Sequence, residues 1–217
     1  MTVERYSLLL LRSNDTIGMD IRTSPHGITL GGKYLTLLDR FVLEFIRILE
    51  PVTPYVIVSG YVAILFGRSR GTEDVDILIP HLEKKSFAEL HEALTNGGYE
   101  FLNAEDADGL YDMLTRRMGI RIARKDQFIP NIELKFLKDE VDRSVIRDRV
   151  GVNLPDAHVY ISPIDIQIAY KLYLGSEKDI EDALYLWEIF KEDLNEENLK
   201  MWMKTFGVRG DEYGIGI

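Results

Sequence analysis

The 217-residue chain is 46% hydrophobic and 29% charged, a composition typical of ordinary globular proteins with room for one large domain or two small lobes. It contains no cysteine, which excludes disulfides, thiolate catalysis and cysteine zinc sites. The formal net charge of −10 argues against broad, sequence-independent binding to nucleic acid, although it is compatible with a local basic channel. No apolar run approaches the roughly 20 residues that a membrane helix needs, so we expect a cytoplasmic protein with no membrane partner.

The first 34 residues predict a small β extension. Tyr6–Leu11 and Ile17–Ile21 have the composition of strands, and Gly27–Leu30 supplies a third candidate before the break at Gly31-Gly32. The leucine run in the first of these segments is too short for the core of a signal peptide. Nothing here indicates chemistry, so a structural or dimer-forming role is the default.

Hydrophobic periodicity predicts the elements on either side of the central stretch. A helix is expected over Thr36–Glu50, because Thr36 and Asp39 have capping-box spacing, an apolar stripe follows, and Pro51 ends it. Further along, the same reasoning predicts a helix over Lys84–Asn96, a strand over Tyr99–Leu102 and a helix over Asp106–Arg117. Two more strands are predicted after them, over Ile120–Ala123 and Ile132–Phe136.

The rest of the chain is organised around residues 55–80. Val56–Val58 is a β-branched run typical of a buried strand, Ser59-Gly60 ends it, and Val62–Phe66 predicts a short helix. A polar turn over Arg68–Thr72 leads into a second strand, Asp74–Ile79.

Two acids on this second strand indicate a metal site. Because alternate side chains of a strand share a face, Asp74 and Asp76 point the same way. Two carboxylates at that spacing favour a bound divalent cation, and oxygen ligands suit Mg²⁺. Ser59 and Gly60 lie at a strand-to-helix junction, where backbone N–H groups attract phosphate. Considered alone, the acidic pair has a non-functional alternative interpretation, a solvated strand end beside a tight turn.

The whole arrangement resembles the signature of the DNA polymerase β nucleotidyltransferase superfamily: a strand, Ser-Gly, a helix, a basic turn, and a strand with Asp-x-Asp. The segment Gly-Arg-Ser-Arg-Gly-Thr-Glu-Asp-Val-Asp-Ile, residues 67–77, is most similar to the AbiEii-like and minimal nucleotidyltransferases. Ser59 stands where that family more commonly has glycine.

The resemblance implies an NTP substrate and two Mg²⁺ ions bound by Asp74 and Asp76. Ser59 and Gly60 would cradle the terminal phosphates of the nucleotide. Two further residues, Arg68 and Arg70, would offset the phosphate charge, although arginines in turns are often merely solvated.

The resemblance also implies a third carboxylate on a neighbouring strand, which binds one metal and helps to deprotonate the acceptor hydroxyl. Glu133 matches by position, because it alternates with apolar residues in the predicted strand Ile132–Phe136, although the family more often uses Asp. The alternative is that Glu133 pairs with Lys135 or with an arginine on a solvated sheet face.

The C-terminal third is predicted to be helical after a charged linker at residues 139–158. Ser162-Pro163-Ile164-Asp165 has capping-box spacing with proline at the first helical position, and Gly175 ends that helix. A second capping box, at residues 176–179, begins the next helix, and Leu199–Phe206 is the last.

These helices again resemble the AbiEii-like family, which carries a Lys-Leu and, further on, an Arg/Lys-Asp-x-x-Asp. By that resemblance Lys171 contacts the triphosphate, while Lys178 and Asp182, one turn apart, line the cleft. The alternatives are that Asp179 only caps its helix and that Lys178 and Asp182 form a surface ion pair of small worth.

The sequence therefore predicts an α/β (α+β) fold, a small mixed β-sheet nucleotidyltransferase core with flanking helices and a C-terminal helical lobe. The expected parts are an N-terminal β extension (1–34), the core (35–145) and the helical lobe (146–217). The expected activity is Mg²⁺-dependent transfer of a nucleoside monophosphate from an NTP, such as ATP, onto a hydroxyl. The acceptor stays open among RNA such as tRNA, a protein and a small molecule.

Three alternatives to that activity stay open. The first is a toxin–antitoxin component of the same fold, acting with a partner protein or as a homodimer. The second is a degenerate nucleotidyltransferase that binds a nucleotide or partner without catalysis, which gains support if Glu133 lies far from the aspartates. The third is a plain structural scaffold.

Overall fold

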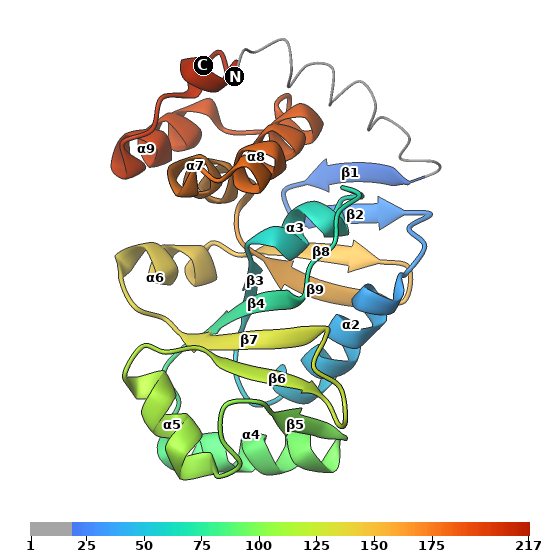
Figure 1. Ribbon diagram of the computed structural model, residues 1–217. Coiled ribbons are helices and arrows are strands. Elements are labelled where there is room, and N and C mark those ends of the chain that lie inside the picture. Colours follow the sequence, from blue (N-terminus) through green and yellow to red (C-terminus); the bar gives the residue numbers. More distant parts are fainter. Residues whose placement is uncertain (1–18) are drawn as a thin grey trace.

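The computed structural model describes residues 19–217, and the strands within this range form one mixed sheet with the order β1-β2-β8-β9-β3-β4-β7-β6-β5 (Figure 1). The predicted α/β fold class is thereby confirmed. The strands are β1 (Asp20–Ser24), β2 (Gly27–Gly31), β3 (Val56–Val58), β4 (Asp74–Ile79), β5 (Tyr99–Phe101), β6 (Ile120–Arg124), β7 (Asn131–Phe136), β8 (Val150–Leu154) and β9 (Ala157–Ile161).

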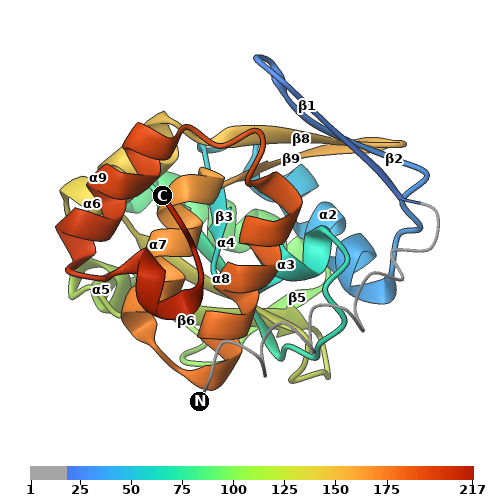
Figure 2. The same ribbon diagram turned by 90° about the horizontal axis from the view of Figure 1, so that it is seen from above.

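The helices lie on the sheet and beyond one end of it. They are α2 (Leu37–Leu49), α3 (Gly60–Leu65), α4 (Lys84–Asn96), α5 (Ala107–Thr115), α6 (Glu140–Arg147), α7 (Ile164–Leu174), α8 (Glu177–Phe190) and α9 (Glu196–Phe206), followed by a 3-10 turn, η1 (Gly210–Tyr213). Seen from above, α7, α8 and α9 form a helical lobe over one side of the molecule. The β1–β2 hairpin projects outward from the other side (Figure 2). Across residues 19–217, no helix combines the length and the apolar character needed to cross a bilayer.

The helix predicted over Thr36–Glu50 is confirmed as α2, with Thr36 as its N-cap. The Thr36 hydroxyl accepts a hydrogen bond from the Asp39 N–H, and the Asp39 carboxylate accepts one from the Thr36 N–H, which completes the expected capping box. Asp39 is fully buried and also accepts a hydrogen bond of 2.7 Å from the Tyr61 hydroxyl of α3. The cap thus ties α2 to the helix that follows Ser59-Gly60.

The central strands pair as their alternating pattern requires. β3 runs antiparallel to β4 with Val58 opposite Asp76, and β4 runs parallel to β7 with Asp76 opposite Glu133. Side chains of successive residues point to opposite faces, so the odd-numbered apolar residues of β4 join the main core, whereas Leu78 belongs to a smaller cluster with Val145 of α6 and Ile166 of α7. The acids therefore share the face that α6 and the helical lobe cover.

The predicted linker at residues 139–158 is wrong, because the segment contains α6, β8 and the start of β9. Gly151 and Pro155 suggested irregular structure, but Gly151 lies within β8, close against the ring of His158, and Pro155 lies in the hairpin turn. The capping box expected at Ser162 is also wrong, since the Ser162 hydroxyl donates instead to the side chain of Gln167.

The sheet continues across the boundaries expected at residues 34/35 and 145/146. β2 pairs in parallel with β8, and β9 pairs in parallel with β3, so strands from all three expected parts share one sheet. The division into three parts stays a prediction. Of the strands expected near the N-terminus, Tyr6–Leu11 and the start of Ile17–Ile21 lie outside the described residues, and β1 begins at Asp20.

We expect Tyr61→Phe to lower the free energy of unfolding by about 1–3 kcal/mol, because the buried Asp39 carboxylate loses a donor. Urea denaturation measures the difference. The matched control is Tyr34→Phe, since Tyr34 is 84% exposed and should tolerate the same change. Equal stability of the two variants would contradict the role given to the buried hydroxyl.

Candidate active site

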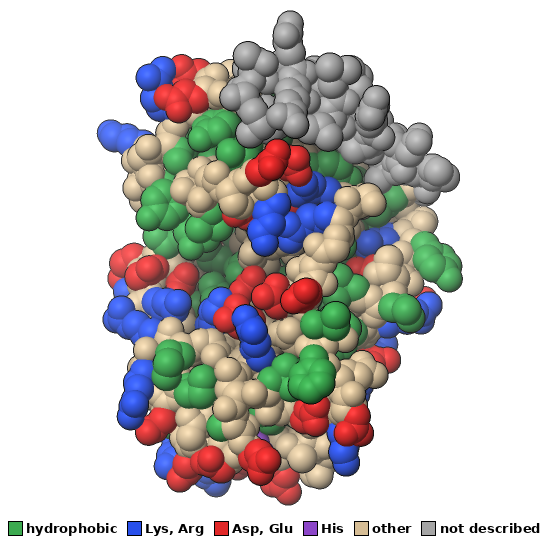
Figure 3. Space-filling view, viewed as in Figure 1, with side chains coloured by type: hydrophobic (Ala, Val, Ile, Leu, Met, Phe, Trp, Pro, Cys, Tyr) green, Lys and Arg blue, Asp and Glu red, His purple; other side chains and the backbone are tan. Residues whose placement is uncertain are grey.

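A cleft of about 620 Å³ lies between the sheet, α6 and the helical lobe. Its lining includes Ser59, Asp76 and Lys135 from the core and Tyr170, Tyr173 and Phe206 from the lobe. On the face drawn in Figure 3, acidic side chains gather over the region of β4 and β7, and Lys and Arg side chains gather above them toward α3 and α8. Opposite charges thus meet where the core faces the lobe.

The carboxylates of Asp76 and Glu133 lie side by side with an ammonium group between them. The parallel register of β4 and β7 places the two acids directly opposite each other on one face. The Nζ of Lys135 lies 2.8 Å from Asp76 Oδ1 and 2.8 Å from Glu133 Oε2. Burial alone would lower the pKa of Lys135, but the charges of Asp76 and Glu133 outweigh it and raise that pKa above its ordinary value.

Glu133 and Asp74 occupy the two edges of this acidic group. A methyl group added at Gly119 would fall 2.7 Å from Glu133 Oε1, so the carboxylate rests directly against the glycine backbone. Asp74, on the same face of β4 as Asp76, lies beside Thr72, whose hydroxyl donates to the Asp74 carbonyl at 2.9 Å. The predicted triad of Asp74, Asp76 and Glu133 therefore lies on one face of two adjacent strands.

Ser59 has an unusual backbone conformation at the junction of β3 and α3. Its φ of 65° and ψ of −141° lie in a region that residues other than glycine rarely adopt, so the backbone is strained at this serine. Gln167 of α7 hydrogen-bonds to the backbone of Ser59 on both sides. Its Nε2 donates to the Ser59 carbonyl at 2.6 Å, and its Oε1 accepts from the Ser59 N–H at 3.3 Å. The helical lobe therefore fixes the Ser-Gly loop.

Gly60 leaves room for the close approach of Arg70. A methyl group added at Gly60 would meet Nη2 of Arg70 unless that side chain moved, so the guanidinium packs directly on the Ser-Gly loop. This places a fixed positive charge beside the backbone predicted to bind phosphate.

Three cations converge on Asp182, a fully buried residue of α8. Its Oδ1 pairs with Arg68, and its Oδ2 lies 2.9 Å from Lys171 Nζ and 3.4 Å from Arg70 Nη1. Lys171 also pairs with Asp179. We call these five residues, Arg68, Arg70, Lys171, Asp179 and Asp182, the Asp182 network.

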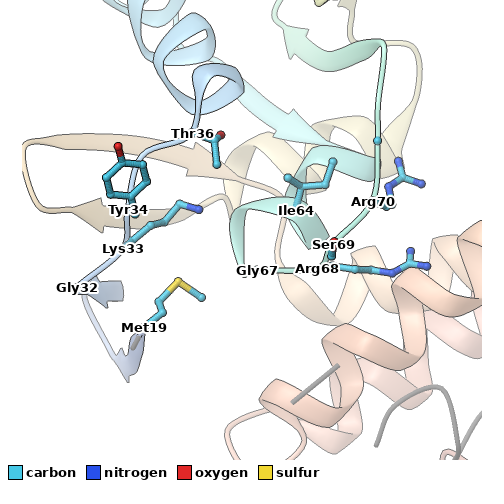
Figure 4. A pocket seen from close by; sticks show the side chains of 11 residues that line it. Met19, Gly32, Lys33, Tyr34, Thr36, Ile64, Gly67, Arg68, Ser69 and Arg70 are labelled. Atoms are coloured by element: carbon cyan, nitrogen blue, oxygen red, sulfur yellow. The ribbon is translucent and has the colours of Figure 1, made fainter. Parts of the chain in front are cut away.

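The Asp182 network joins the turn after α3 to the helical lobe. Figure 4 shows a second cavity, of about 540 Å³, which Lys33 and Tyr34 line on one side and Arg68 and Arg70 of this turn line on the other. Burial lowers the pKa of Lys171, and Asp179 offsets this only in part. Burial by itself would raise the pKa of Asp179, but Lys171 and Ser176 outweigh it and lower that pKa.

The structure brings together most of the residues predicted for nucleotide binding, but it separates Lys178 from them. Ser59, Gly60 and Arg70 meet at one loop, and Arg68, Lys171 and Asp182 meet beside it. The side chain of Lys178 is exposed, and only its carbonyl, which accepts from Arg68, reaches the network. Asp179 is more than a cap, since it caps α8 through Ser176 and also pairs with Lys171.

Two residues of the site carried weak sequence signals. Gln167 was not predicted; it is a buried amide on a helix in a chain with one other glutamine, Gln127. Lys135 entered only as an alternative partner for Glu133, although its i+2 spacing on the strand put it on the same face.

The donor set fits a divalent cation only in part. Among the described residues, no group of three or more His, Asp or Glu side chains is arranged to hold a metal ion. Asp76 and Glu133 nevertheless converge on one cation, the ammonium of Lys135, and hard carboxylate oxygens of this kind suit Mg²⁺ when substrate phosphates supply further ligands. The binding of two Mg²⁺ ions by Asp74, Asp76 and Glu133 stays a prediction.

No family model matches the chain, and no curated protein matches its sequence. Among solved structures, the solution structure of the antibiotic-resistance factor ANT(2'')-Ia has a TM-score of 0.50 at 14% identity, over 80% of this chain and 93% of that one. A crystal structure of ANT(2'')-Ia with adenylyl-2''-tobramycin has a TM-score of 0.46 at 16% identity, over 78% and 95% of the two chains. A nucleotidyltransferase-like protein from Paracoccidioides brasiliensis has a TM-score of 0.44 at 16% identity, over 76% and 84%.

The first of these likenesses shows the fold, which this chain shares with ANT(2'')-Ia. At this level of identity it shows the fold alone. The closer resemblance to AbiEii-like proteins stays a prediction.

We expect Asp182→Asn to lower the free energy of unfolding by about 3–5 kcal/mol, because it leaves three converging cations without their buried counter-charge. The matched control is Glu181→Gln on the same helix, whose partly exposed carboxylate pairs with Arg68 and should cost about 1 kcal/mol or less. Thermal and chemical denaturation measure both. Similar losses in the two variants would contradict the account of the Asp182 network.

We expect Ser59→Gly to raise the free energy of unfolding by about 1 kcal/mol, since the relief of backbone strain outweighs the added freedom of the unfolded chain. Ser69→Gly is the control, because Ser69 lies in the turn after α3 without a positive φ and should gain nothing. A Ser59→Gly protein that is less stable than the wild type would contradict the strain assigned to this junction.

Proposed function

We propose that the protein is a nucleotidyltransferase that moves a nucleoside monophosphate from an NTP onto the hydroxyl of an acceptor. One observation carries the proposal: the Ser59-Gly60 loop ends β3 directly beside Asp76, and Glu133 lies opposite Asp76 on β7. Ser59 of the loop and Asp76 of the acidic group therefore line one cleft. The fold shared with ANT(2'')-Ia supports this proposal.

In the proposed reaction, the acceptor oxygen forms a bond to the α-phosphorus, the bond between the α- and β-phosphates breaks, and pyrophosphate leaves. Glu133 takes the proton of the attacking hydroxyl. Mg²⁺ bound by Asp74, Asp76 and Glu133 would supply the positive charge that offsets the phosphates and the developing charge.

The other residues hold the substrate and the loop. Ser59 and Gly60 lie along the terminal phosphates, with the guanidinium of Arg70 beside them. Gln167 keeps the loop in place from the lobe. Lys171 and Arg68 act through Asp182, because Lys171 is only 2% exposed and both side chains pair with acids.

A second candidate function is nucleotide binding without catalysis. It is favoured by Lys135, which pairs with two of the three acids that a catalytic metal requires. The position of Glu133 opposite Asp76 favours the enzyme instead, because a distant Glu133 was the feature expected of a binding module. The acceptor stays open, and an AbiEii-like toxin–antitoxin role and the cytoplasmic location stay predictions.

We expect the wild type to bind an NTP only with Mg²⁺ and the double variant Asp74→Asn/Asp76→Asn to lose that binding, as measured by calorimetry. The control Asp108→Asn/Asp112→Asn removes the same charge from the exposed face of α5 and should bind normally. NTP binding that is indifferent to Mg²⁺ and to the β4 substitutions would contradict the proposed site.

A second measurement separates the two candidate functions. The NTP is labelled at the α-phosphate, and a cell extract supplies the acceptor. The wild type should transfer the label to a product, whereas Glu133→Gln should bind the NTP without forming a labelled product. Binding by the wild type without any labelling would favour the second candidate.

A further inference from the structure

The ammonium of Lys135 lies where a metal ion would have to bind. It is 2.8 Å from one oxygen of Asp76 and 2.8 Å from one oxygen of Glu133. These acids are held on opposite positions of adjacent strands by the ladder between β4 and β7, so their carboxylates repel each other at close range. A cation between them offsets this repulsion.

An ammonium group and a divalent cation cannot share this position. Both would need the same inner oxygens of Asp76 and Glu133, and two cations at that spacing repel each other strongly in a partly buried site. A Mg²⁺ ion that binds these acids must therefore displace Lys135 first.

Lys135 has room to move when it is displaced. Its side chain is 23% exposed. The flexible four-carbon stem lets the ammonium group turn into the cleft that Ser59 also lines. In that cleft the triphosphate proposed to lie along Ser59-Gly60 offers anionic oxygens to replace the carboxylates.

We propose that Lys135 is an internal cation that competes with Mg²⁺ for Asp76 and Glu133 and is released when a nucleotide supplies a new anionic partner. The proposal rests on the proposed function and adds a mode of regulation to it. Metal binding is then coupled to nucleotide binding: Mg²⁺ binds weakly alone and tightly with an NTP, and Lys135 pairs with phosphate in the loaded protein.

The test measures Mn²⁺ binding to the full chain by electron paramagnetic resonance without any nucleotide. Replacing Lys135 by methionine should tighten Mn²⁺ binding about tenfold or more, because the competing charge is removed. The control is Lys138→Met, which removes a lysine that lines the same cleft without pairing with Asp76 or Glu133. Unchanged Mn²⁺ affinity in Lys135→Met, or equal tightening in both variants, would overturn the proposal.

A second measurement serves if Lys135→Met fails to fold because its two carboxylates are left without their cation. The milder variant Lys135→Gln keeps a hydrogen-bond donor, and Mn²⁺ should raise its melting temperature more than that of the wild type. Equal Mn²⁺-dependent stabilisation of Lys135→Gln and the wild type would also overturn the proposal.

Titration with an NTP distinguishes this inference from the proposed function. If Lys135 is released to phosphate, the NTP should tighten Mn²⁺ binding to the wild type by a larger factor than to Lys135→Met. Failure of the wild type to bind an NTP would contradict the proposed function and the release step. The competition between Lys135 and the metal is decided separately, by the Mn²⁺ affinities of the wild type and Lys135→Met without nucleotide.

Discussion

The parallel pairing of β4 with β7 is the constraint on which the rest of the site depends. It places Asp76 directly opposite Glu133 on a partly buried face, where two negative charges cannot move apart. Lys135, on the same strand as Glu133, offsets part of this repulsion. A ligand that enters the cleft therefore meets two carboxylates that already share one ammonium group.

A second group of charges fixes the other side of the cleft. Asp182, buried in the helical lobe, holds Arg68 and Arg70 of the turn after α3 and thereby sets the guanidinium of Arg70 on Gly60. Gln167 reaches from the lobe to the strained Ser59. A buried ion pair is weak evidence for stability, but here it specifies where the lobe docks on the core, and so it shapes the loop assigned to phosphate.

Local patterns were sufficient for most of the fold. Capping at Thr36 and alternation in Asp74–Ile79 depend on neighbours a few residues away, so the sequence predicted β4 with its bounds and α2 to within one residue at each end. The hairpin of β8 and β9 was missed because it is stabilised by long-range pairing with β2 and β3, which overrides the irregular structure that Gly151 suggested. The central acids were predictable for the same local reason that made β4 predictable.

Which residues belong to the site was easier to predict than which of their side chains pair with one another. Lys178 and Asp182 are one helical turn apart, and the spacing suggested an ion pair, yet tertiary packing turns Asp182 toward three other cations and leaves Lys178 in solvent. The place of Lys135 between two acids depends on the register of two strands more than 50 residues apart in the chain, as the Asp76–Lys135 separation shows.

The most direct test of the account is a crystal structure of the protein with Mn²⁺ and a non-hydrolysable NTP, with the metal located by its anomalous scattering. We expect Mn²⁺ to be bound by Asp76, with the ammonium of Lys135 moved from the carboxylates to a phosphate oxygen. Nucleotide bound with Lys135 still between Asp76 and Glu133, and no metal at these acids, would contradict it.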